Sequence, residues 1–412
     1  MSVKNKILSK IPSTTVTNLT NNFTQTKKIQ ASDRPGWPAQ FGTAIDVSAN
    51  HIIVGAYQDP SYLSKGAAYL FGIDGGQIGK LVPSDSAQND RFSTQNNYGV
   101  VVTKSRVYVG TSDKDSGKGA VYFFDLTGTQ LMKLQPSDLA NLNSFGSSMA
   151  ATESRLVVAA PQQTITNTYE GSAYIFDIDG NQLGKIVASD PQNYKLFGRS
   201  IALSDTRIVV GGTKDNVKGT DAGAAYVFDI HGTQLAKLYA PDAQAYDFFG
   251  RSIAVSDTRI VVGTNWDSHE GGEPENNPHN NLKGAAYVFD TDGNFIKTLQ
   301  PNDLSAADSE GFGGSEFGYS VDCSASRIVV SCKDGSSVYI FDNNGDQLAK
   351  IISSDHSSND NFGWGLGVSD TNIVVGATQN DTAGSTYIFK NFYNHIPNIN
   401  FDKLRRHFTG KI

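Results

Sequence analysis

Cysteine, tryptophan and methionine are scarce in this chain, and it has neither a net positive charge nor a long apolar run. Its 412 residues include two cysteines, three tryptophans and three methionines. The formal net charge is −7, so no overall basic field would attract nucleic acid or an anionic membrane. No apolar run approaches the ~18 residues that span a membrane. We therefore expect no membrane insertion and no nucleic-acid partner.

A disulfide is also not expected. Cys323 and Cys332 lie in two adjacent predicted strands. If their hairpin turns near Ala325, the two cysteines are about five residues out of register, or roughly 15 Å apart, which is too far for a disulfide. We expect both to be small buried residues.

Internal repetition is what the sequence has in abundance. An aromatic residue followed by Gly opens each of seven units, and a Tyr-x-Phe pair follows each opening. The openings are Phe41, Tyr98, Phe145, Phe197, Phe249, Phe317 and Phe362, and the pairs begin at Tyr69, Tyr122, Tyr174, Tyr226, Tyr287, Tyr339 and Tyr387.

Each unit contains four short β-branched runs, which predict four strands. The third and fourth runs are joined by turns such as 177–180, Asp-Ile-Asp-Gly, in which Asp accepts backbone N–H bonds and Gly takes the left-handed position. A metal loop is the alternative, but the third place also holds Thr127, a poor ligand. A four-stranded meander of about 50 residues is in the range of a propeller blade.

The ends of the repeat region predict how the ring closes. The seventh unit stops at Lys390 without a fourth strand, whereas residues 28–33 repeat the fourth-strand ending before the first complete unit. An N-terminal strand that completes the last blade would close the ring. We therefore predict an all-β, seven-bladed β-propeller of four-stranded antiparallel blades over residues 25–390.

Two tails flank the propeller. Residues 1–24 form an extended Thr/Asn-rich tail that lacks the hydrophobic core of a secretory signal, and residues 391–412 form a basic tail. We expect the tails to dock the propeller onto a larger assembly. The residues assigned to docking are Lys4, Lys6, Lys10, Phe401, Leu404, Arg405, Arg406 and Phe408.

One end of the ring is predicted to vary and the other to be uniform. In a meander, the connection between strands two and three emerges at the same end as the crossing to the next blade, and nearly all length variation falls there. Binding residues usually lie on such loops over a rigid scaffold. The candidates on this variable face are Tyr57, Tyr62, Trp266, His269, Glu270, Glu310 and Glu316. For Trp266, packing of the loop onto its own blade is an open alternative.

Three sets of repeated charges have simpler interpretations. The aspartates that end the fourth strands would cap turns rather than form a cation ring. The lysines five residues before them would lie on a solvated strand face. The arginines that open the second strands would pair with turn aspartates rather than form a basic ring. The aspartates are Asp33, Asp85, Asp138, Asp190, Asp242, Asp303 and Asp355.

The units resemble the FG-GAP repeats of integrin α-subunit propellers and of many microbial and viral proteins. The FG opening, the VVG ending of the second strand and the GAAYVF that follows carry this resemblance along about nine tenths of the chain. Calcium-binding members have an Asp-rich loop between the first and second strands, whereas 204–206 is the short turn Ser-Asp-Thr. The resemblance implies adhesion and binding scaffolds more often than enzymes, here without the calcium sites.

We expect a non-enzymatic binding or assembly propeller without catalytic residues, cofactor or metal. Its partners would be other protein chains of a larger assembly, or a glycan. A structural or receptor-binding component of a viral (phage) particle is favoured. A cytoplasmic interaction scaffold is the second interpretation, and a hydrolase or lyase with a site at the propeller mouth is the third.

Overall fold

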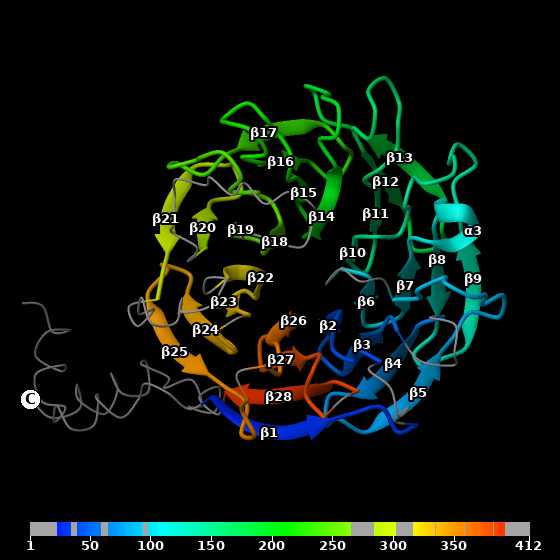
Figure 1. Cartoon of the computed structure of the whole chain (residues 1–412), viewed down its shortest axis with the longest axis vertical. Coiled ribbons are helices and arrows are strands. Elements are labelled where there is room, and N and C mark those ends of the chain that lie inside the picture. The colour runs from blue at the N-terminus through cyan, green and yellow to red at the C-terminus, as the bar shows by residue number, and fades with distance from the viewer. Residues whose placement is uncertain are drawn as a thin grey trace, which may run out of the picture.

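A computed structural model of the chain forms a ring of seven four-stranded antiparallel sheets, as predicted (Figure 1). The structure describes residues 23–33, 39–58, 65–93, 98–264, 284–301, 316–333, 335–357, 359–381 and 383–391. In each blade one strand lies near the centre of the ring, and the last strand of the meander lies at the perimeter.

The strands follow the chain order from blade to blade. Blade one contains β2 (Ile45–Val47), β3 (His51–Ala56), β4 (Ala67–Gly72) and β5 (Gln77–Leu81), and blade two contains β6 (Val100–Val102), β7 (Val107–Thr111), β8 (Ala120–Phe124) and β9 (Gln130–Leu134). Blade three contains β10 (Met149–Ala151), β11 (Leu156–Ala160), β12 (Ser172–Phe176) and β13 (Gln182–Ile186), and blade four contains β14 (Phe197–Leu203), β15 (Ile208–Gly212), β16 (Ala224–Phe228) and β17 (Gln234–Leu238).

The remaining blades have the same order. Blade five contains β18 (Ser252–Val255), β19 (Ile260–Thr264), β20 (Ala285–Phe289) and β21 (Phe295–Leu299), and blade six contains β22 (Phe317–Cys323), β23 (Arg327–Cys332), β24 (Ser337–Asp342) and β25 (Gln347–Ile351). Blade seven contains β26 (Phe362–Val368), β27 (Asn372–Ala377), β28 (Ser385–Asn391) and β1 (Phe23–Ile29). A short element, α3 (Lys114–Gly117), lies between β7 and β8, but positive φ angles at Asp115 and Ser116 make it an irregular turn.

The middle strands are apolar on both sides because neighbouring blades cover both faces of each sheet. Every residue of β15 and β16 is buried, whereas the outer strand β17 buries Leu238 fully and its other residues only in part. The hydrophobic clusters lie between blades: Val157 and Ile175 of blade three pack with Ile208 and Tyr226 of blade four. The core is therefore a set of interblade layers.

The aromatic residue that opens a blade packs edge-on against that blade's own Tyr-x-Phe pair. In blade three the ring centroid of Phe145 lies 5.6 Å from that of Tyr174 and 6.1 Å from that of Phe176. In blade two this place is taken by Phe92, 5.7 Å from Tyr122, and not by Tyr98, so the predicted opening of that blade was wrong. The signal was in the sequence, since Phe92 follows Asp85 at the same spacing as Phe145 follows Asp138.

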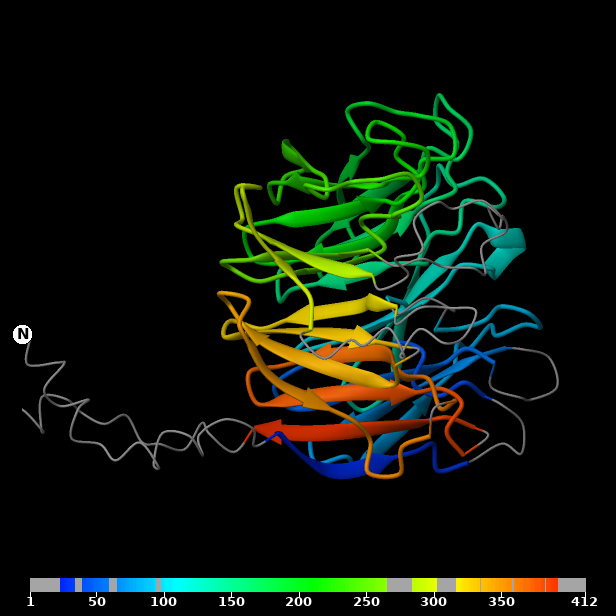
Figure 2. The same ribbon diagram turned by 60° about the vertical axis from the view of Figure 1, so that its left-hand side comes forward.

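The N-terminal strand closes the ring, as predicted. β1 pairs antiparallel with β28, with Lys28 opposite Tyr387, and Figures 1 and 2 both show blue β1 beside red β28. β1 begins at Phe23, two residues before the predicted boundary of the propeller. Ile29 is buried in the cluster that joins blade seven to blade one.

The turns between strands follow the predicted chemistry. The Asp177 side chain accepts hydrogen bonds from the backbone N–H groups of Asp179 (3.0 Å) and Asn181 (2.8 Å), and Gly180 has a φ of 85°. Between strands one and two the chain turns tightly, as where the Ser204 N–H donates to the Arg207 carbonyl at 2.9 Å. Cys323 and Cys332 are free, with Cys332 buried and Cys323 half-buried.

Candidate functional site

The aspartates that end the fourth strands tie each blade to the next one. Asp138 accepts hydrogen bonds from the Tyr174 hydroxyl at 2.9 Å and from the Lys185 ammonium at 2.7 Å, both in the following blade. Burial alone would raise the pKa of Asp138, but these two donors outweigh it and lower the pKa. Aspartates 33, 85, 190 and 355 have the same Tyr and Lys partners in their following blades.

These contacts correct two expectations. The aspartates serve an interblade link rather than acting chiefly as turn caps, and the lysines are not simply solvated, since Lys185 also lies 4.9 Å from the Tyr174 ring centroid. The expected pairing of arginines with turn aspartates is confirmed for Arg106, 3.2 Å from Asp179, and for Arg207, 3.1 Å from Asp292. These repeated charges therefore link each blade to its neighbour.

The variable connections and the crossings meet at one end of the ring, as expected from the meander. Isolated bridges join the connection between strands two and three to the opening of the next blade, as between Gly171 and Phe197. Buried ion pairs add a second tie between these loops: Lys114 with Asp90 at 2.9 Å, Lys195 with Asp215 at 3.0 Å, and Lys333 with Glu316 at 2.7 Å.

Two of the predicted binding residues lie in the described part of the chain. Tyr57 is 3% exposed, with its hydroxyl accepting a hydrogen bond from Gln58, and Glu316 is 6% exposed in its pair with Lys333. Their burial gives both a role inside the loops, and their binding role stays a prediction. The other predicted site residues lie outside the described residues: Tyr62, Trp266, His269, Glu270, Glu310, Lys4, Lys6, Lys10, Phe401, Leu404, Arg405, Arg406 and Phe408.

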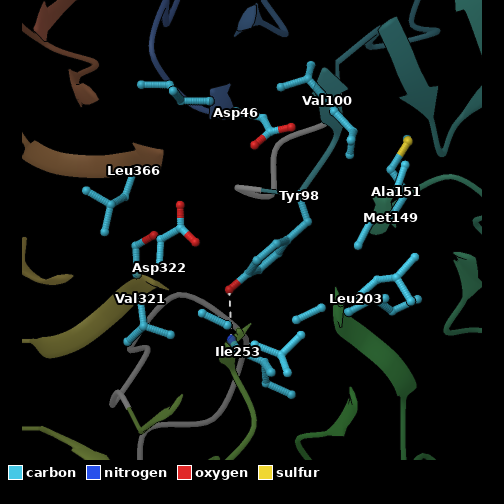
Figure 3. A pocket seen from close by; sticks show the side chains of 18 residues that line it. Asp46, Tyr98, Val100, Met149, Ala151, Leu203, Ile253, Val321, Asp322 and Leu366 are labelled. Carbon is cyan, nitrogen blue, oxygen red and sulfur yellow. Dashed lines mark hydrogen bonds between the residues drawn. The ribbon is translucent and has the colours of Figure 1, made fainter. Parts of the chain in front are cut away.

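First strands from all seven blades line a central cavity of about 150 Å³ (Figure 3). Its walls are mainly apolar, and the Tyr98 side chain lies across it from blade two. The Ile253 N–H of blade five donates a hydrogen bond to the Tyr98 hydroxyl at 3.1 Å. Tyr98 was predicted to open blade two. Its side chain instead crosses the channel and reaches blade five.

Two carboxylates also face this cavity, Asp46 from blade one and Asp322 from blade six (Figure 3). Each accepts two backbone N–H bonds, one from its own strand and one from the next blade, as Asp322 does from Cys323 (2.8 Å) and Val368 (2.7 Å). Burial, followed by the nearby charge of Asp46, raises the pKa of Asp322 to about 8. Sequence reasoning missed both residues, although they interrupt a position that is small or apolar in the other five blades.

The mouth of this channel, on the variable face, is built by one repeated backbone turn. In blade four the Arg199 N–H donates to the Leu196 carbonyl at 3.0 Å, and in blade five Arg251 donates to Phe248 at 3.1 Å. The residue that accepts has a positive φ in both blades. The same turn places Ser147, Tyr319 and Trp364 in blades three, six and seven. We call Arg251, Tyr319, Trp364 and the neighbouring Lys333, which contact one another, the mouth cluster.

The architecture defines the class as a closed β-propeller with its loops gathered at one end. The chain belongs to the FG-GAP repeat family, whose sequence pattern matches residues 23–71, 129–176, 181–228, 233–289 and 346–389. This family and fold support, in general, a protein-binding or structural propeller. In the described residues, the structure has no helix that is long and apolar enough to cross a membrane.

Comparison with other proteins supports the fold assignment and does not indicate a function. A search of curated proteins found no significant match. Among 457 matching chains of solved structures is virginiamycin B lyase from Staphylococcus aureus, with a TM-score of 0.56 and 9% sequence identity, covering 89% of this chain and 98% of that chain. At this identity the likeness shows the fold alone, because one fold hosts many unrelated functions.

Proposed function

We propose that the chain is a non-enzymatic binding propeller that contacts a protein or glycan partner through its variable face. The observation that supports this most strongly is the difference between the two ends of the ring. At one end the turns between strands one and two are uniformly short, while the connections at the other end vary in length and are tied down by buried ion pairs. Binding residues usually lie on such loops over a rigid scaffold.

We further propose that the propeller is a structural or receptor-binding component of a viral (phage) particle. The Asn-, Lys-, Ile-, Ser- and Thr-rich composition and the two flanking tails support this assignment. In this proposal residues 1–22 and 392–412 attach the ring to the assembly, and the variable face stays available for the partner. A free cytoplasmic scaffold is the alternative that the same tests distinguish.

A loop replacement tests the binding face. Residues 265–283 of blade five are replaced by the short 333–335 connection of blade six, which joins the same two strands in its own blade. We expect capture of the partner from host-surface or particle extracts to be lost, with the thermal midpoint unchanged. The control changes the opposite face with Asp205→Ala. Equal loss of capture in the control would contradict the proposed face.

Tail deletions test the assembly role. Removal of residues 1–22 leaves β1 intact, and removal of 392–412 leaves β28 intact. We expect the full chain to co-sediment with particles and each deletion to reduce this attachment. A full chain that never co-sediments with particles would leave the cytoplasmic scaffold as the better interpretation.

A further inference from the structure

An apolar pocket of about 200 Å³ lies on the variable face, between blades three and four. It is formed by the connection from β11 to β12 and by the crossing from β13 to β14. Its aliphatic lining comes from Ile165, Val187, Ala188 and Pro191. Ile165 is 45% exposed and Val187 is 43% exposed, so solvent reaches both side chains. The pocket is therefore accessible from outside the protein.

Hydrogen bonds between the two loops hold the pocket in shape. The Tyr194 N–H of the crossing donates to the Thr168 carbonyl of the connection at 2.7 Å. The side-chain oxygen of Asn193 accepts the Thr168 N–H at 2.9 Å. The Phe197 N–H donates to the Glu170 carbonyl at 3.0 Å. Because the loops are already ordered, a ligand of this pocket does not meet the entropic cost of ordering them.

The polar side chains of the lining are already satisfied inside the protein. The Glu170 carboxylate accepts hydrogen bonds from the backbone N–H groups of Thr166 and Asn167, both at 2.9 Å. It also accepts the Thr166 hydroxyl and the Asn167 side-chain amide, both at 3.0 Å. Among the described lining side chains, each charged or hydroxyl group therefore has a partner.

The charges next to the pocket are paired as well. Asp190, which directly precedes Pro191 in the crossing, lies 2.9 Å from the Lys195 ammonium and 2.6 Å from the Lys237 ammonium. A charged ligand would lose its water of hydration in this pocket without finding an opposite charge that is still available in the lining. The electrostatics therefore favour an uncharged ligand.

The repeats provide an internal comparison for the pocket. Pro191 directly follows Asp190, and the residue that follows Asp138 in the preceding crossing is Leu139. Leu139 is buried in the hydrophobic cluster between blades two and three. Leucine at this place packs inward in one crossing, whereas proline lines an open pocket in the next. Joining two blades therefore does not require the pocket.

The same two loops carry a pair of aromatic residues. The ring centroids of Tyr169 in the connection and Tyr194 in the crossing are 5.7 Å apart, and Tyr194 is exposed. Both residues have a positive φ, of 50° and 59°, which is unfavourable for a bulky residue. Tyrosine is enriched in protein interfaces, where it adds contact area around a buried anchor. These loops thus combine an apolar pocket with an aromatic surface.

We propose that this pocket binds an uncharged apolar side chain, of the size of leucine or phenylalanine, from a partner protein. The inference rests on the proposed binding function and selects a protein partner over a glycan. An apolar cavity of ~150 Å³ can hold a benzene ring, so about 200 Å³ has room for either side chain. The hydroxyl groups of a sugar would lose water against the aliphatic walls without a hydrogen bond in return.

The test uses the full chain with its isoleucine and valine methyl groups labelled for NMR. The probes are the N-acetyl amides of leucine, phenylalanine, alanine and lysine, together with methyl glucoside. Pro191→Leu copies Leu139, and Val187→Gln copies Gln135, which holds the same place in the preceding crossing, so both variants are expected to fold. Val82→Gln is the matched control, since Val82 holds this place after blade one and is 41% exposed.

We expect the leucine and phenylalanine amides to shift the methyl signals of Ile165. They should bind ~10- to 100-fold more tightly than the alanine amide, because they remove more apolar surface from water. Each pocket variant should weaken the leucine amide at least ~5-fold at an unchanged thermal midpoint, whereas Val82→Gln leaves it within about twofold. Tighter binding of the lysine amide or of methyl glucoside, or unchanged binding in both pocket variants, would overturn the inference.

The capture assay connects the pocket to the partner. We expect Val187→Gln to reduce capture of the partner and Val82→Gln to leave it unchanged, with capture abolished by protease treatment of the extract. Capture that survives the protease and is lost after glycosidase treatment would contradict a protein partner. If both pocket variants retain full capture while the blade-five loop replacement abolishes it, the inference fails and the proposed function stands.

Discussion

Hydrogen bonds and ion pairs of single residues join neighbouring blades. The burial of each charged group determines how much its pair contributes to the free energy of unfolding. The Asp-Tyr-Lys link recurs around the ring, mostly with part-exposed partners, so each copy contributes modestly. The link in blade four is different, because Lys195 and Asp215 have fully buried side chains that share the Tyr226 hydroxyl. Buried and exposed pairs of the same chemistry can therefore be compared within one molecule.

We predict that Asp215→Ala destabilises the fold by about 3 kcal/mol, because it removes the buried one of the two carboxylates that pair with the Lys195 ammonium and leaves only the part-exposed Asp190. Asp292→Ala is the matched control. Asp292 is the partner of Arg207, and its own side chain is 76% exposed. We expect the loss of this pair to change the free energy of unfolding by less than about 1 kcal/mol. Urea unfolding of the three proteins measures both effects. Equal costs for the two variants would show that burial does not control these links.

The channel carboxyl Asp322 predicts a pH dependence of the opposite sign to the interblade aspartates. Its pKa of about 8 lies above the ordinary value of 3.8, so the folded state keeps a proton that the unfolded chain releases. Its contribution to stability is therefore fully present near pH 4 and decreases as the pH rises toward 8, by up to ~1.4 kcal/mol per pH unit. The charged group facing it is Asp46, with Tyr98 and Cys323 also nearby.

We predict that Asp322→Ala flattens this dependence. Alanine occupies the same strand position in blades four and five, at Ala202 and Ala254, so the backbone tolerates it. Urea unfolding between pH 5 and 8 should give a smaller decrease in unfolding free energy for the variant than for the unchanged chain. Histidines contribute equally to both and cancel in the difference. Parallel curves for the two proteins would mean that Asp322 titrates normally.

At the scale of the strand and turn, the sequence was sufficient for most of the architecture. Repeated β-branched runs, Asp-x-Asp-Gly turns and the missing last strand predicted four strands per blade and the closing partner of β28. These features are local in the sequence, and each occurs several times. Because the same pattern recurs in seven units, a wrong assignment in one blade does not change the predicted fold.

Features that depend on contacts between blades could not be predicted in this way. The partners of Asp138 lie 36 and 47 residues further along the chain, so no local pattern joins them. Tyr98 was misplaced because its Tyr-Gly pair imitates a blade opening. The mouth cluster escaped notice for a related reason: its members come from different blades, and only the shared turn places them together.

The junction between a variable connection and the next blade gives a prediction for a single glycine. Gly223 has a φ of +82°, and a Cβ there would lie 2.2 Å from the Phe249 carbonyl oxygen and 2.5 Å from its nitrogen. We expect Gly223→Ala to cost at least ~2 kcal/mol through backbone strain and overlap. In Gly184→Ala the new Cβ meets only Ile175 Cδ1 at 3.8 Å, and we expect a gain of ~0.4–1 kcal/mol.

Thermal unfolding of both glycine variants provides the measurement. A lower midpoint for Gly223→Ala together with an equal or higher midpoint for Gly184→Ala would support the bridge as a fixed contact between blades. Similar midpoints would indicate that the connection moves away from Phe249 at little cost, and that the loops of the variable face are less firmly held than their hydrogen bonds suggest.

On the scale of the whole molecule, the ring depends on one strand that joins the two ends of the propeller. β1 pairs along the length of β28, and Lys28 bonds Asp355 of blade six at 2.6 Å. Tyr387, from the other end of the propeller, donates to the same Asp355 at 2.6 Å. The seam therefore repeats the link found between other blades, with its lysine and tyrosine supplied by opposite ends of the chain.

We predict that deletion of residues 1–30 opens the ring, whereas deletion of residues 1–22 leaves its stability unchanged. Without β1, the described side chains of β28 from Ser385 to Phe389, all buried in the closed ring, would lie on an unpaired edge. Such an apolar edge pairs readily with other chains, unlike the outer strands, which carry lysine and glutamine. We expect a lower thermal midpoint and concentration-dependent association on size exclusion for the longer deletion.

A synthetic peptide of residues 23–33 should restore the monomer by reoccupying the edge. A monomeric protein with an unchanged midpoint after the longer deletion would show that interblade packing alone holds the circle, and that β1 is dispensable.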